Sequence, residues 1–423
     1  MEEGPMKRRF LAIFVCMAVL LASFTGCYSP QENAPSVPTA PTQAAQTESG
    51  SGAEEPVEIK TYPLPEENVR ANIIYVPSPS TGGFWTFAVF NASSIQAYDP
   101  VTRTSYIPCY QAGCKHNDES CTAYFGKEIT ALADYRGNFY AMICYNDDTA
   151  SALVTRPVSG GPLEVLARWE PENENEVRRC GLYGLSFGKA YLTVAKETFA
   201  MEDGQEELAD EEYSDCYLDL ETGELVEYMA DEDGYLPYMH GVWDDVAVFQ
   251  DWYADRPDGT PVKRDGSEDY NFRLYSKNLR TGEEKTIVDV TENFIWTADP
   301  HVSWGQYTVY QVDRSVYVYD METQTSKKLF THEPGWDFYN YMIQDGHVMV
   351  IGGTEDTCRA WAIDIMDGSV VELDTYGENV VAFSAHYECN GYFVGLLHAS
   401  NNADQYYISK EDFYRSNYDG AFR

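Results

Sequence analysis

Three cysteines and a histidine lie close together in the stretch CYQAGCKHNDESC, which runs from Cys109 to Cys121. The spacing is C-x4-C-x-H-x4-C, so the candidate metal ligands are Cys109, Cys114, His116 and Cys121. Three thiolates and one imidazole complete a tetrahedral zinc shell with no open position, which is typical of a structural site. The sequence therefore predicts one structural zinc ion, which would stabilise a loop that has few apolar side chains of its own.

A disulfide is the alternative chemistry for the same cysteines. Outside the cytoplasm cysteines can oxidise, and a bond that closes a short loop contributes up to about 3 kcal/mol. Three cysteines leave one over, and its partner would have to be Cys144, Cys180, Cys216, Cys358 or Cys389. Those five lie in or beside strand-like runs, where a buried thiol is the usual state. A loop with reduced, merely structural thiols is the third interpretation, and the lack of C-x-x-C disfavours a redox role.

The elements that position this cluster are predicted to be short β-strands. From about Thr61 onward, apolar residues alternate with polar ones or occur in short runs. Examples are GFWTFAVF, GNFYAMICY, KAYLTVA, DVAVFQDWY, YTVYQV, HVMVIGG and GYFVGLLHA. These runs are rich in Val, Tyr, Phe and Ile and are flanked by Gly, Asn or Asp. No long window keeps the helical period, so the predicted fold class is all-β.

The strands belong to a larger repeat with a tight turn between a second and a third strand. It occurs as AYDPVTRTSYIP, TRPVSGGPLEVL, YLDLETGELVEY, SKNLRTGEEKTIV, VYDMETQTSKKLF and AIDIMDGSVVELD, with a degenerate copy at YYISKEDFYRSN. A four-stranded unit repeated at about 40 to 50 residues is typical of a β-propeller, in which neighbouring blades cover each other's apolar faces. We expect a β-propeller domain over residues 61–423 with seven four-stranded blades, six and eight being the neighbouring counts. A pair of β-sandwiches is the alternative, and it would break the repeat once.

In this scheme the cysteine cluster lies in the connection between two blades. TSYIPC ends the last strand of the first blade at Cys109, and KEITALA, residues 127–133, begins the next blade. In propellers such connections share a face with the middle hairpin loops, and ligands usually bind there. Two acidic, glycine-containing stretches, AMEDGQEELADEEYSD and ADRPDGTPVKRDGSED, are predicted to be exposed insertions.

An export signal precedes the strand region. The basic cluster KRR at residues 7–9 comes before an uncharged run at residues 10–26, which is the order of a secretory leader. The run ends in FTGCYS, and small residues directly before a cysteine resemble the lipobox of bacterial lipoproteins. The resemblance implies that residues 1–26 are a lipoprotein signal peptide and that Cys27 is lipidated. Two acyl chains suffice for stable anchoring to a membrane.

Residues 27–60 are predicted to be a disordered tether between the lipid and the folded domain. They are rich in Pro, Ser, Thr, Gln, Ala and Glu and cannot bury enough surface to offset their ordering entropy. The formal net charge of −39 excludes nucleic acid as a partner, because a polyanion repels phosphate backbones. The membrane would therefore be contacted through the lipid rather than through a basic surface.

The lipobox, the tether, the strand repeat, the Cys-His cluster and the closing YYISKEDFY resemble a group of extracytoplasmic bacterial lipoproteins of the Gram-positive type. These carry a TolB-like β-propeller or a related domain of unknown function. The resemblance implies a location on the outer face of the cell membrane and a propeller scaffold. It implies no particular activity, because the group has no established common activity.

Signals for other chemistry are sparse. GLSFG, Gly184–Gly188, matches the G-x-S-x-G nucleophile elbow, but a strand follows where that motif needs a helix. Calcium could bind among acidic turns such as DEDG, Asp231–Gly234, and solvated turns are the alternative interpretation. Trp252 and Trp336 neighbour acidic or turn residues and are the candidate side chains for stacking on a sugar ring or a peptide aromatic group.

We therefore expect a membrane-anchored, extracytoplasmic lipoprotein whose propeller is a scaffold for ligand binding or protein interaction and has no catalytic residues. Its ligand would be an envelope glycan, a peptide or a protein. The alternative is an extracytoplasmic hydrolase that acts on glycans or peptides. That activity would require carboxylates and a histidine that converge at the centre of the ring.

Overall fold

The computed structural model describes residues 60–423 apart from 72–75, 79–82, 88–92, 110, 119, 146–148, 203–204, 232–235, 254–270, 291–302, 313, 333–336, 355–356, 377–379 and 399–404. The predicted leader, the lipidation site Cys27 and the tether up to residue 59 lie outside the described residues. Residues 59–400 and 404–423 form one compact unit. In the segments described, none of the helices has the length and apolar character needed to cross a membrane.

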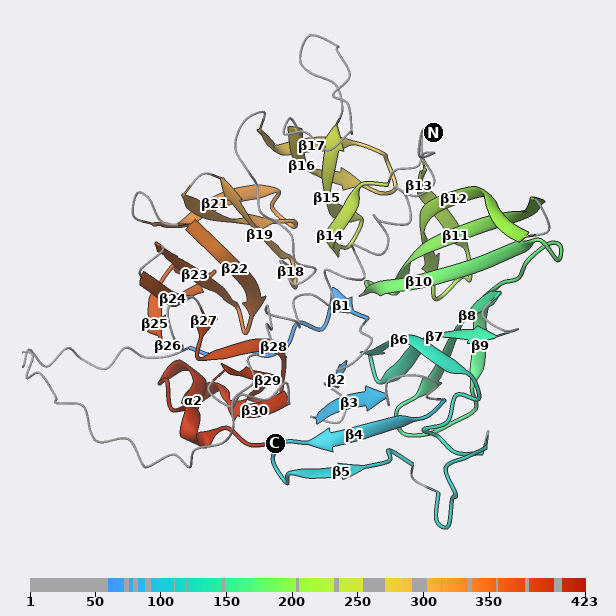
Figure 1. Ribbon diagram of the computed structural model, residues 1–423, viewed down its shortest axis with the longest axis horizontal. Coiled ribbons are helices and arrows are strands. Elements are labelled where there is room, and N and C mark those ends of the chain that lie inside the picture. Colours follow the sequence, from blue (N-terminus) through green and yellow to red (C-terminus); the bar gives the residue numbers. More distant parts are fainter. Residues whose placement is uncertain are drawn as a thin grey trace, which may run out of the picture. The chain divides into compact units, whose positions relative to one another are not determined.

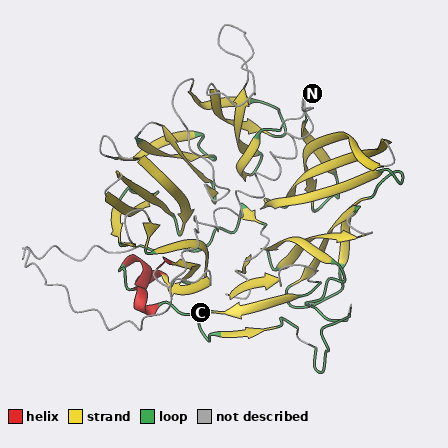
Figure 2. Cartoon of the chain, viewed as in Figure 1, coloured by secondary structure: helices red, strands yellow, loops and turns green. Residues whose placement is uncertain are grey.

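Antiparallel sheets make up nearly all of the regular structure (Figure 2). The first sheet contains β2 (Val76–Ser78), β3 (Gly83–Phe87), β4 (Ile95–Asp99) and β5 (Thr104–Tyr106). The second contains β6 (Glu128–Tyr135), β7 (Asn138–Tyr145), β8 (Ala150–Pro157) and β9 (Glu164–Trp169). The third contains β1 (Val69–Arg70), β10 (Glu176–Ser186), β11 (Lys189–Glu202), β12 (Gln205–Asp219) and β13 (Leu225–Ala230), in that spatial order.

Four further sheets follow along the chain. The fourth contains β14 (Tyr238–Trp243), β15 (Val246–Tyr253), β16 (Asn271–Asn278) and β17 (Glu284–Val290). The fifth contains β18 (Ser303–Trp304), β19 (Tyr307–Val312), β20 (Ser315–Asp320) and β21 (Thr325–Thr331). The sixth contains β22 (Asp337–Gln344), β23 (His347–Thr354), β24 (Thr357–Asp364) and β25 (Val370–Leu373), and a small hairpin of β26 (Thr375–Tyr376) and β27 (Val380–Val381) follows it. The seventh contains β28 (Phe383–Cys389), β29 (Tyr392–Leu397) and β30 (Gln405–Ser409).

These seven sheets of three to five strands, counted over the described residues, surround a common centre (Figure 1). Apolar clusters fill the junctions between neighbouring sheets. At one of them Phe249 and Tyr275 of the fourth sheet pack with Tyr191 of the third. Another cluster joins Tyr407 of the seventh sheet to Tyr98 of the first, so the ring returns to its start. The protein is therefore an all-β β-propeller, as the strand repeat predicts, and not a pair of sandwiches.

Two kinds of turn recur around the ring. Several turns between a first and a second strand consist of two residues with φ between 47° and 78°: Arg136–Gly137, Phe187–Gly188, Asp345–Gly346 and Asn390–Gly391. This is the conformation of two-residue hairpins, and glycine adopts it without steric cost. Turns between a third and a fourth strand instead use an Asx side chain. Asp219 Oδ1, for example, accepts the backbone N–H groups of Glu221 and Thr222 at 3.0 and 2.8 Å.

The structure corrects two sequence predictions. The repeated tight turn joins the third and fourth strands of a sheet, not the second and third. The degenerate seventh copy continues from β30 into helix α2 (Lys410–Tyr414) and the short 3₁₀ helix η2 (Tyr418–Gly420) rather than into a fourth strand. Of the two predicted insertions, the acidic stretch at residues 200–215 forms part of the long β11–β12 hairpin, and most of the other falls in 254–270, outside the described residues.

Candidate metal centre

The four predicted metal ligands lie in the connection between β5 and β6, as the sequence predicts. One donor atom from each of Cys109, Cys114, His116 and Cys121 lies within 4.8 Å of all the others. A tetrahedral zinc site with Zn–S bonds of about 2.3 Å has sulfur–sulfur edges of about 3.8 Å, so the four donors are arranged almost as a bound ion would require. The cluster could therefore hold one metal ion.

Tight turns bring these ligands together over a short length of chain. His116 has a left-handed φ of 59°, and Gly113 has a φ of 76°. The left-handed turn allows ligands two positions apart to face one point. The His116 backbone N–H donates to Cys114 Sγ at 3.4 Å, and His116 Nδ1 lies 3.4 Å from Cys121 Sγ. Asp118 Oδ1 accepts the backbone N–H of Ser120 at 3.0 Å and so shapes the turn before Cys121.

The thiols of the cluster differ in their preferred charge. Burial opposes ionisation of Cys109, but hydrogen bonds from the backbone N–H groups of Gln111 and Thr122 and from the Thr122 and Cys114 side chains outweigh it and lower the pKa of Cys109 to about 6. Burial and the neighbouring thiols raise the pKa of Cys121 to about 11. A metal ion would provide the positive charge that three adjacent thiolates need.

A buried arginine from β8 binds the backbone of the cluster loop. Arg156 is 1% exposed, and its Nη1 donates to the carbonyl oxygens of Cys121 at 2.6 Å and of Tyr124 at 3.1 Å. Its guanidinium carbon also lies 5.4 Å from the centre of the Phe125 ring. Burial lowers the pKa of Arg156, while attraction to the thiols of Cys121 and Cys109 acts in the opposite direction. This positive charge suits a site rich in thiolates.

The connection is also fixed to the sheets on either side. The Thr122 hydroxyl donates to the Pro108 carbonyl at 3.0 Å, and Ile95 N–H of the first sheet donates to Ala123 O at 2.9 Å. Gly160, in the turn after β8, has a φ of 98°, and a Cβ built there would lie 2.8 Å from a methyl carbon of Thr122. Only glycine allows this turn of the second sheet to approach so closely.

A polar pocket of about 480 Å³ opens beside the cluster. Cys109, Cys114 and His116 form part of its wall and are half-buried, whereas Cys121 is buried. The other lining residues come from β4, β5 and the connection: Gln96, Ser105, Tyr106, Ile107, Gln111 and Gly113. Three of the four donors are therefore reachable from the surface.

The described cysteines are not joined by disulfides. Like the three cluster thiols, Cys144, Cys180, Cys216 and Cys389 form no disulfide, and all four but Cys144 are buried. The disulfide interpretation is thus wrong for this part of the chain. Cys358 lies in β24, and its side chain is outside the described residues.

The remaining sequence candidates have different outcomes. Trp336 lies outside the described residues, and Trp252 lies in β15 with its side chain not described, so no stacking site is placed. Most of the DEDG turn proposed for calcium falls in the undescribed segment 232–235. Ser186 of GLSFG is fully buried at the end of β10 and is followed by a hairpin turn and β11, which rules out a nucleophile elbow.

Sequence reasoning missed a buried ion cluster beside helix α2. Lys410 Nζ donates to Asp345 Oδ1 at 2.8 Å and to Glu388 Oε2 at 2.6 Å, and all three side chains are at most 6% exposed. The Tyr414 hydroxyl donates to Asp345 Oδ2 at 3.0 Å, and Trp304 Nε1 donates to Glu388 Oε1 at 2.9 Å. These groups satisfy one another and join the fifth, sixth and seventh sheets. The motif SKEDFY was visible in sequence, but its partners were not.

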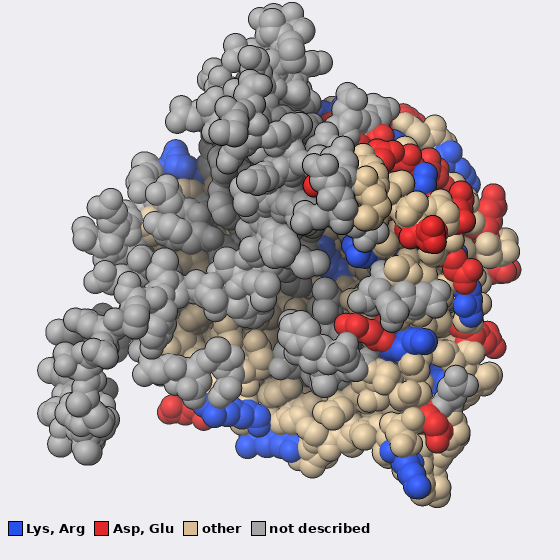
Figure 3. All heavy atoms as spheres, turned by 45° about the vertical axis from the view of Figure 1, so that its right-hand side comes forward, with Lys and Arg blue, Asp and Glu red and all other residues tan. Residues whose placement is uncertain are grey.

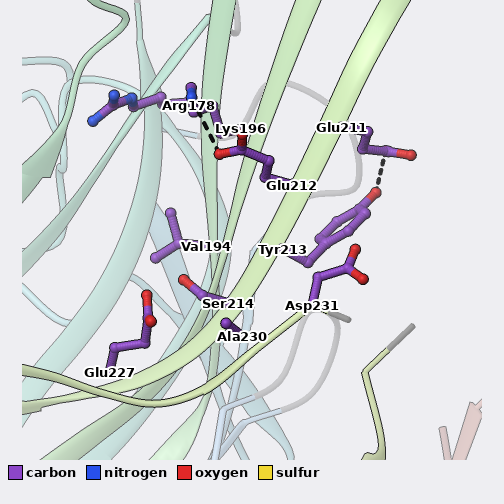
Figure 4. Close-up of a pocket in the computed structure, with 10 residues that line it drawn as sticks. All are labelled: Arg178, Val194, Lys196, Glu211, Glu212, Tyr213, Ser214, Glu227, Ala230 and Asp231. Carbon is purple, nitrogen blue, oxygen red and sulfur yellow. Dashed lines mark hydrogen bonds and ion pairs between the residues drawn. The ribbon is translucent and has the colours of Figure 1, made fainter. Parts of the chain in front are cut away.

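A second pocket, of about 560 Å³, lies along the long hairpin of the third sheet (Figure 4). Four of its lining residues are acidic and two are basic; the full set is Arg178, Val194, Lys196, Glu211, Glu212, Tyr213, Ser214, Glu227, Ala230 and Asp231. Lys196 pairs with Glu212 at 3.1 Å, and the Tyr213 hydroxyl donates to Glu211. Acidic and basic side chains are interspersed on the face that Figure 3 brings forward, which is typical of a solvated surface.

Fold and site together define a β-propeller with a Cys₃His cluster between its first two sheets. The sequence matches no family model and no curated protein. A puromycin hydrolase mutant complexed with PGG is similar in structure, with a TM-score of 0.47, 13% identity and 84% of this chain covered. A Pyrococcus horikoshii acylaminoacyl peptidase aligns with a TM-score of 0.46 at 11% identity over 82% of this chain. This chain covers only 55% and 53% of those two proteins.

The β-propeller domain of the Trilobed protease from Pyrococcus furiosus aligns with a TM-score of 0.43 at 10% identity. The alignment covers 80% of this chain and 95% of that domain. At these levels the similarities concern the fold alone, and no argument about chemistry follows from them.

Proposed function

We propose that this protein is an extracytoplasmic lipoprotein whose β-propeller, with one blade for each of the seven sheets, is a scaffold for ligand binding or protein interaction. In this proposal Cys27 carries the lipid, residues 1–26 are removed, and an envelope glycan, peptide or protein is the ligand. The proposal is supported by the basic cluster and uncharged run that precede Cys27 in the sequence and by the pairing of the buried Lys410 with Glu388 within the ring.

The metal centre has a structural role in this proposal. Zinc is the ion that three thiolates and an imidazole select, and four protein ligands leave no position for substrate. The observation that carries the assignment is the convergence of the four donor atoms within 4.8 Å in a loop of irregular structure. The ion would hold the connection in one conformation and so fix the first junction of the ring.

Metal analysis of the natively purified mature chain tests this assignment. We expect one zinc ion per chain, which strong chelators remove, and we expect the three cluster thiols to react with thiol reagents only after removal. Cys114→Ser should reduce the zinc content to near zero, because loss of one of four ligands abolishes a closed site. Cys144→Ser, which alters a half-buried thiol outside the cluster, is the matched control and should leave one zinc bound. A metal-free native chain would refute the assignment.

The scaffold proposal is distinguished from the hydrolase alternative by turnover. Among the described residues, the buried acids Asp345 and Glu388 are paired with Lys410, and His240 pairs with Gln250 at 3.0 Å. These groups serve the packing of the ring, which favours binding over hydrolysis. We expect saturable binding to envelope glycan or peptide fragments without cleavage. Hydrolysis that continues with multiple turnovers would establish the alternative.

A further inference from the structure

The chain crosses the ring before it enters the first sheet. Lys60–Ala71 precedes β2, yet its strand β1 pairs with β10 of the third sheet: Val69 lies opposite Leu185, and Arg70 opposite Gly184. In Figure 1, β1 lies near the centre of the ring. The segment therefore has to pass several sheets, and its contacts show which.

At one end, Tyr62 joins the segment to the sixth sheet and to helix α2. Its backbone N–H donates to Asp345 Oδ1 at 2.6 Å, and its hydroxyl donates to Asp364 Oδ2 at 2.7 Å. Lys410 Nζ donates to its carbonyl oxygen at 3.3 Å. A Cβ built on Gly346 would lie 2.6 Å from the Tyr62 ring, so the turn between β22 and β23 is shaped to receive this side chain.

In the middle of the segment, Glu67 binds the second and third sheets together. Its carboxylate accepts the Tyr135 hydroxyl at 2.7 Å, the Arg136 guanidinium and the backbone N–H of Phe187. Arg136 and Phe187 are the left-handed residues of two first-to-second strand turns. The Glu67 side chain is only 13% exposed, whereas the Arg136 side chain is 55% exposed, so the carboxylate itself is largely buried against the two turns.

The last residues of the segment contact the fourth and fifth sheets. Asn68 Nδ2 donates to the Gly305 carbonyl at 2.6 Å, in the turn between β18 and β19. Arg70 donates to the His240 carbonyl at 2.5 Å and to the Ser303 hydroxyl at 2.9 Å. One short segment thus makes hydrogen bonds to sheets two to six and to the helix that follows sheet seven.

The junction between the seventh and first sheets is built differently. Within the described residues the seventh sheet has three strands, and no N-terminal strand pairs with it. Tyr98 of the first sheet stacks on Tyr407 with 4.2 Å between ring centres, and Phe422 pairs with Tyr407 through two backbone hydrogen bonds of 2.7 and 2.9 Å. Arg103 lies 3.9 Å above the Phe422 ring. Side chains and the C-terminal tail close this junction without a continuous sheet.

We propose that Lys60–Ala71 is a strap that keeps the ring closed by tying together sheets that are not neighbours, in place of a strand shared across the last junction. Release of the strap would loosen the junction between the seventh and first sheets first. Because the strap continues directly from the predicted tether, a pull on the lipid anchor acts first on the contacts of Lys60 and Tyr62 with turns of the sixth sheet and then on Glu67. The role of the strap in closing the ring does not depend on the proposed ligand binding, but its role as an anchor point rests on the proposed lipidation.

Hydrogen exchange on the full mature chain tests the strap. Glu67→Gln removes the shared carboxylate charge, and the Phe187 amide, which donates to it directly, should exchange about tenfold faster, the factor typical of a lost hydrogen bond to a charged group. The amides of the turn at Arg136, which binds Glu67 through its guanidinium, should also exchange faster. Exchange should also quicken at Tyr98 and Tyr407, which lie far from the mutation along the chain. Glu197→Gln is the matched control, because Glu197 is also 13% exposed and pairs with an exposed arginine.

The control should change exchange only near β10 and β11. If Glu67→Gln accelerates exchange at its own two turns but leaves the last junction unchanged, the strap does not close the ring and the proposal is refuted. This readout involves no ligand and no lipid, so its failure would leave the scaffold proposal untouched.

Mechanical extension between the N-terminus and C-terminus gives a second measurement. The twelve residues of the strap span at most about 40 Å when extended. We expect an early step of about that length before the sheets unfold, at a lower force in Glu67→Gln than in the control. A single unfolding event that begins in the sheets, with no early step, would contradict the proposal.

Discussion

Replacement of Arg156 by methionine tests whether a buried charge supports the metal centre. The variant keeps an apolar stem and removes the guanidinium, so the Tyr124 carbonyl oxygen loses its donor, whereas the Cys121 carbonyl oxygen keeps the Tyr124 backbone N–H at 3.2 Å. A buried acceptor left without a partner costs about 1–3 kcal/mol. Part of this is offset because the variant no longer buries a charge whose desolvation lowers its pKa. The free energy of unfolding of the metal-free protein should therefore fall by about 1–2 kcal/mol.

The same substitution should weaken zinc binding. A zinc ion with three thiolates and one imidazole carries a net charge of about −1, and Arg156 is the buried cation that contacts the loop. At a separation of about 8 Å and an effective dielectric constant of about 20, the attraction is on the order of 2 kcal/mol. We expect the zinc dissociation constant to rise about 30-fold, within the range of about 10–100-fold that is usual for residues supporting metal ligands.

Competition with a chromophoric chelator at constant pH and salt measures that affinity. Arg168→Met is the matched control, because it removes the same charge from β9 of the same sheet but from a side chain that is 54% exposed. The control should bind zinc as tightly as the unmodified chain. A folded Arg156→Met variant with unchanged zinc affinity would show that the guanidinium only supports the loop backbone and that the electrostatic argument is wrong.

Three further substitutions test the packing of the ring. Burial raises the pKa of Asp215 from 3.8 to about 6, so the contribution of this carboxyl group to stability is greatest below pH 3.8 and is lost as the pH rises through 6. Asp215→Asn should therefore raise the free energy of unfolding by about 2 kcal/mol at pH 7 and change it little at pH 3.5. Denaturant titration at the two pH values measures this difference. Lys410→Met should lower the free energy of unfolding by about 3–5 kcal/mol, because two buried carboxylates lose their cation. In a double-mutant cycle, adding Glu388→Gln to this variant should recover part of that loss. A Cβ on Gly395 would lie 1.8 Å from a carbonyl oxygen of the neighbouring strand, so Gly395→Ala should lower the thermal midpoint, whereas Gly181→Ala, where the Cβ meets nothing within 4 Å, should change it far less.

The position of the tight turn within each sheet could not be predicted from the sequence repeat alone. The turns at Asp219 and Asp320 recur for a local reason, since each side chain accepts backbone N–H groups two and three residues on. That pattern determines the period of the repeat but does not mark where one sheet ends and the next begins. The turn was therefore expected one strand too early, and only the pairing of the strands corrects it.

The local sequence motif predicts the ligands of the metal cluster but not the distant residues that contact it. Its four ligands lie within thirteen residues, so their convergence depends mainly on local turns and could be predicted. Arg156 lies 35 residues beyond Cys121, and nothing in its immediate sequence separates it from any other arginine. The same holds for Lys410, which meets Asp345 from 65 residues away.

The amino-acid sequence by itself determined the all-β class, the repeated four-stranded unit and the cluster of thiols and imidazole, because each depends on side-chain alternation or on neighbours in the chain. The tertiary structure alone decided that β1 joins the third sheet, that the strap crosses the ring, that a buried arginine binds the carbonyl oxygens of the cluster loop, and that a buried lysine pairs with two carboxylates. Those contacts join residues tens to hundreds of positions apart, and they exist only once the apolar faces of the sheets have packed and brought the ring together.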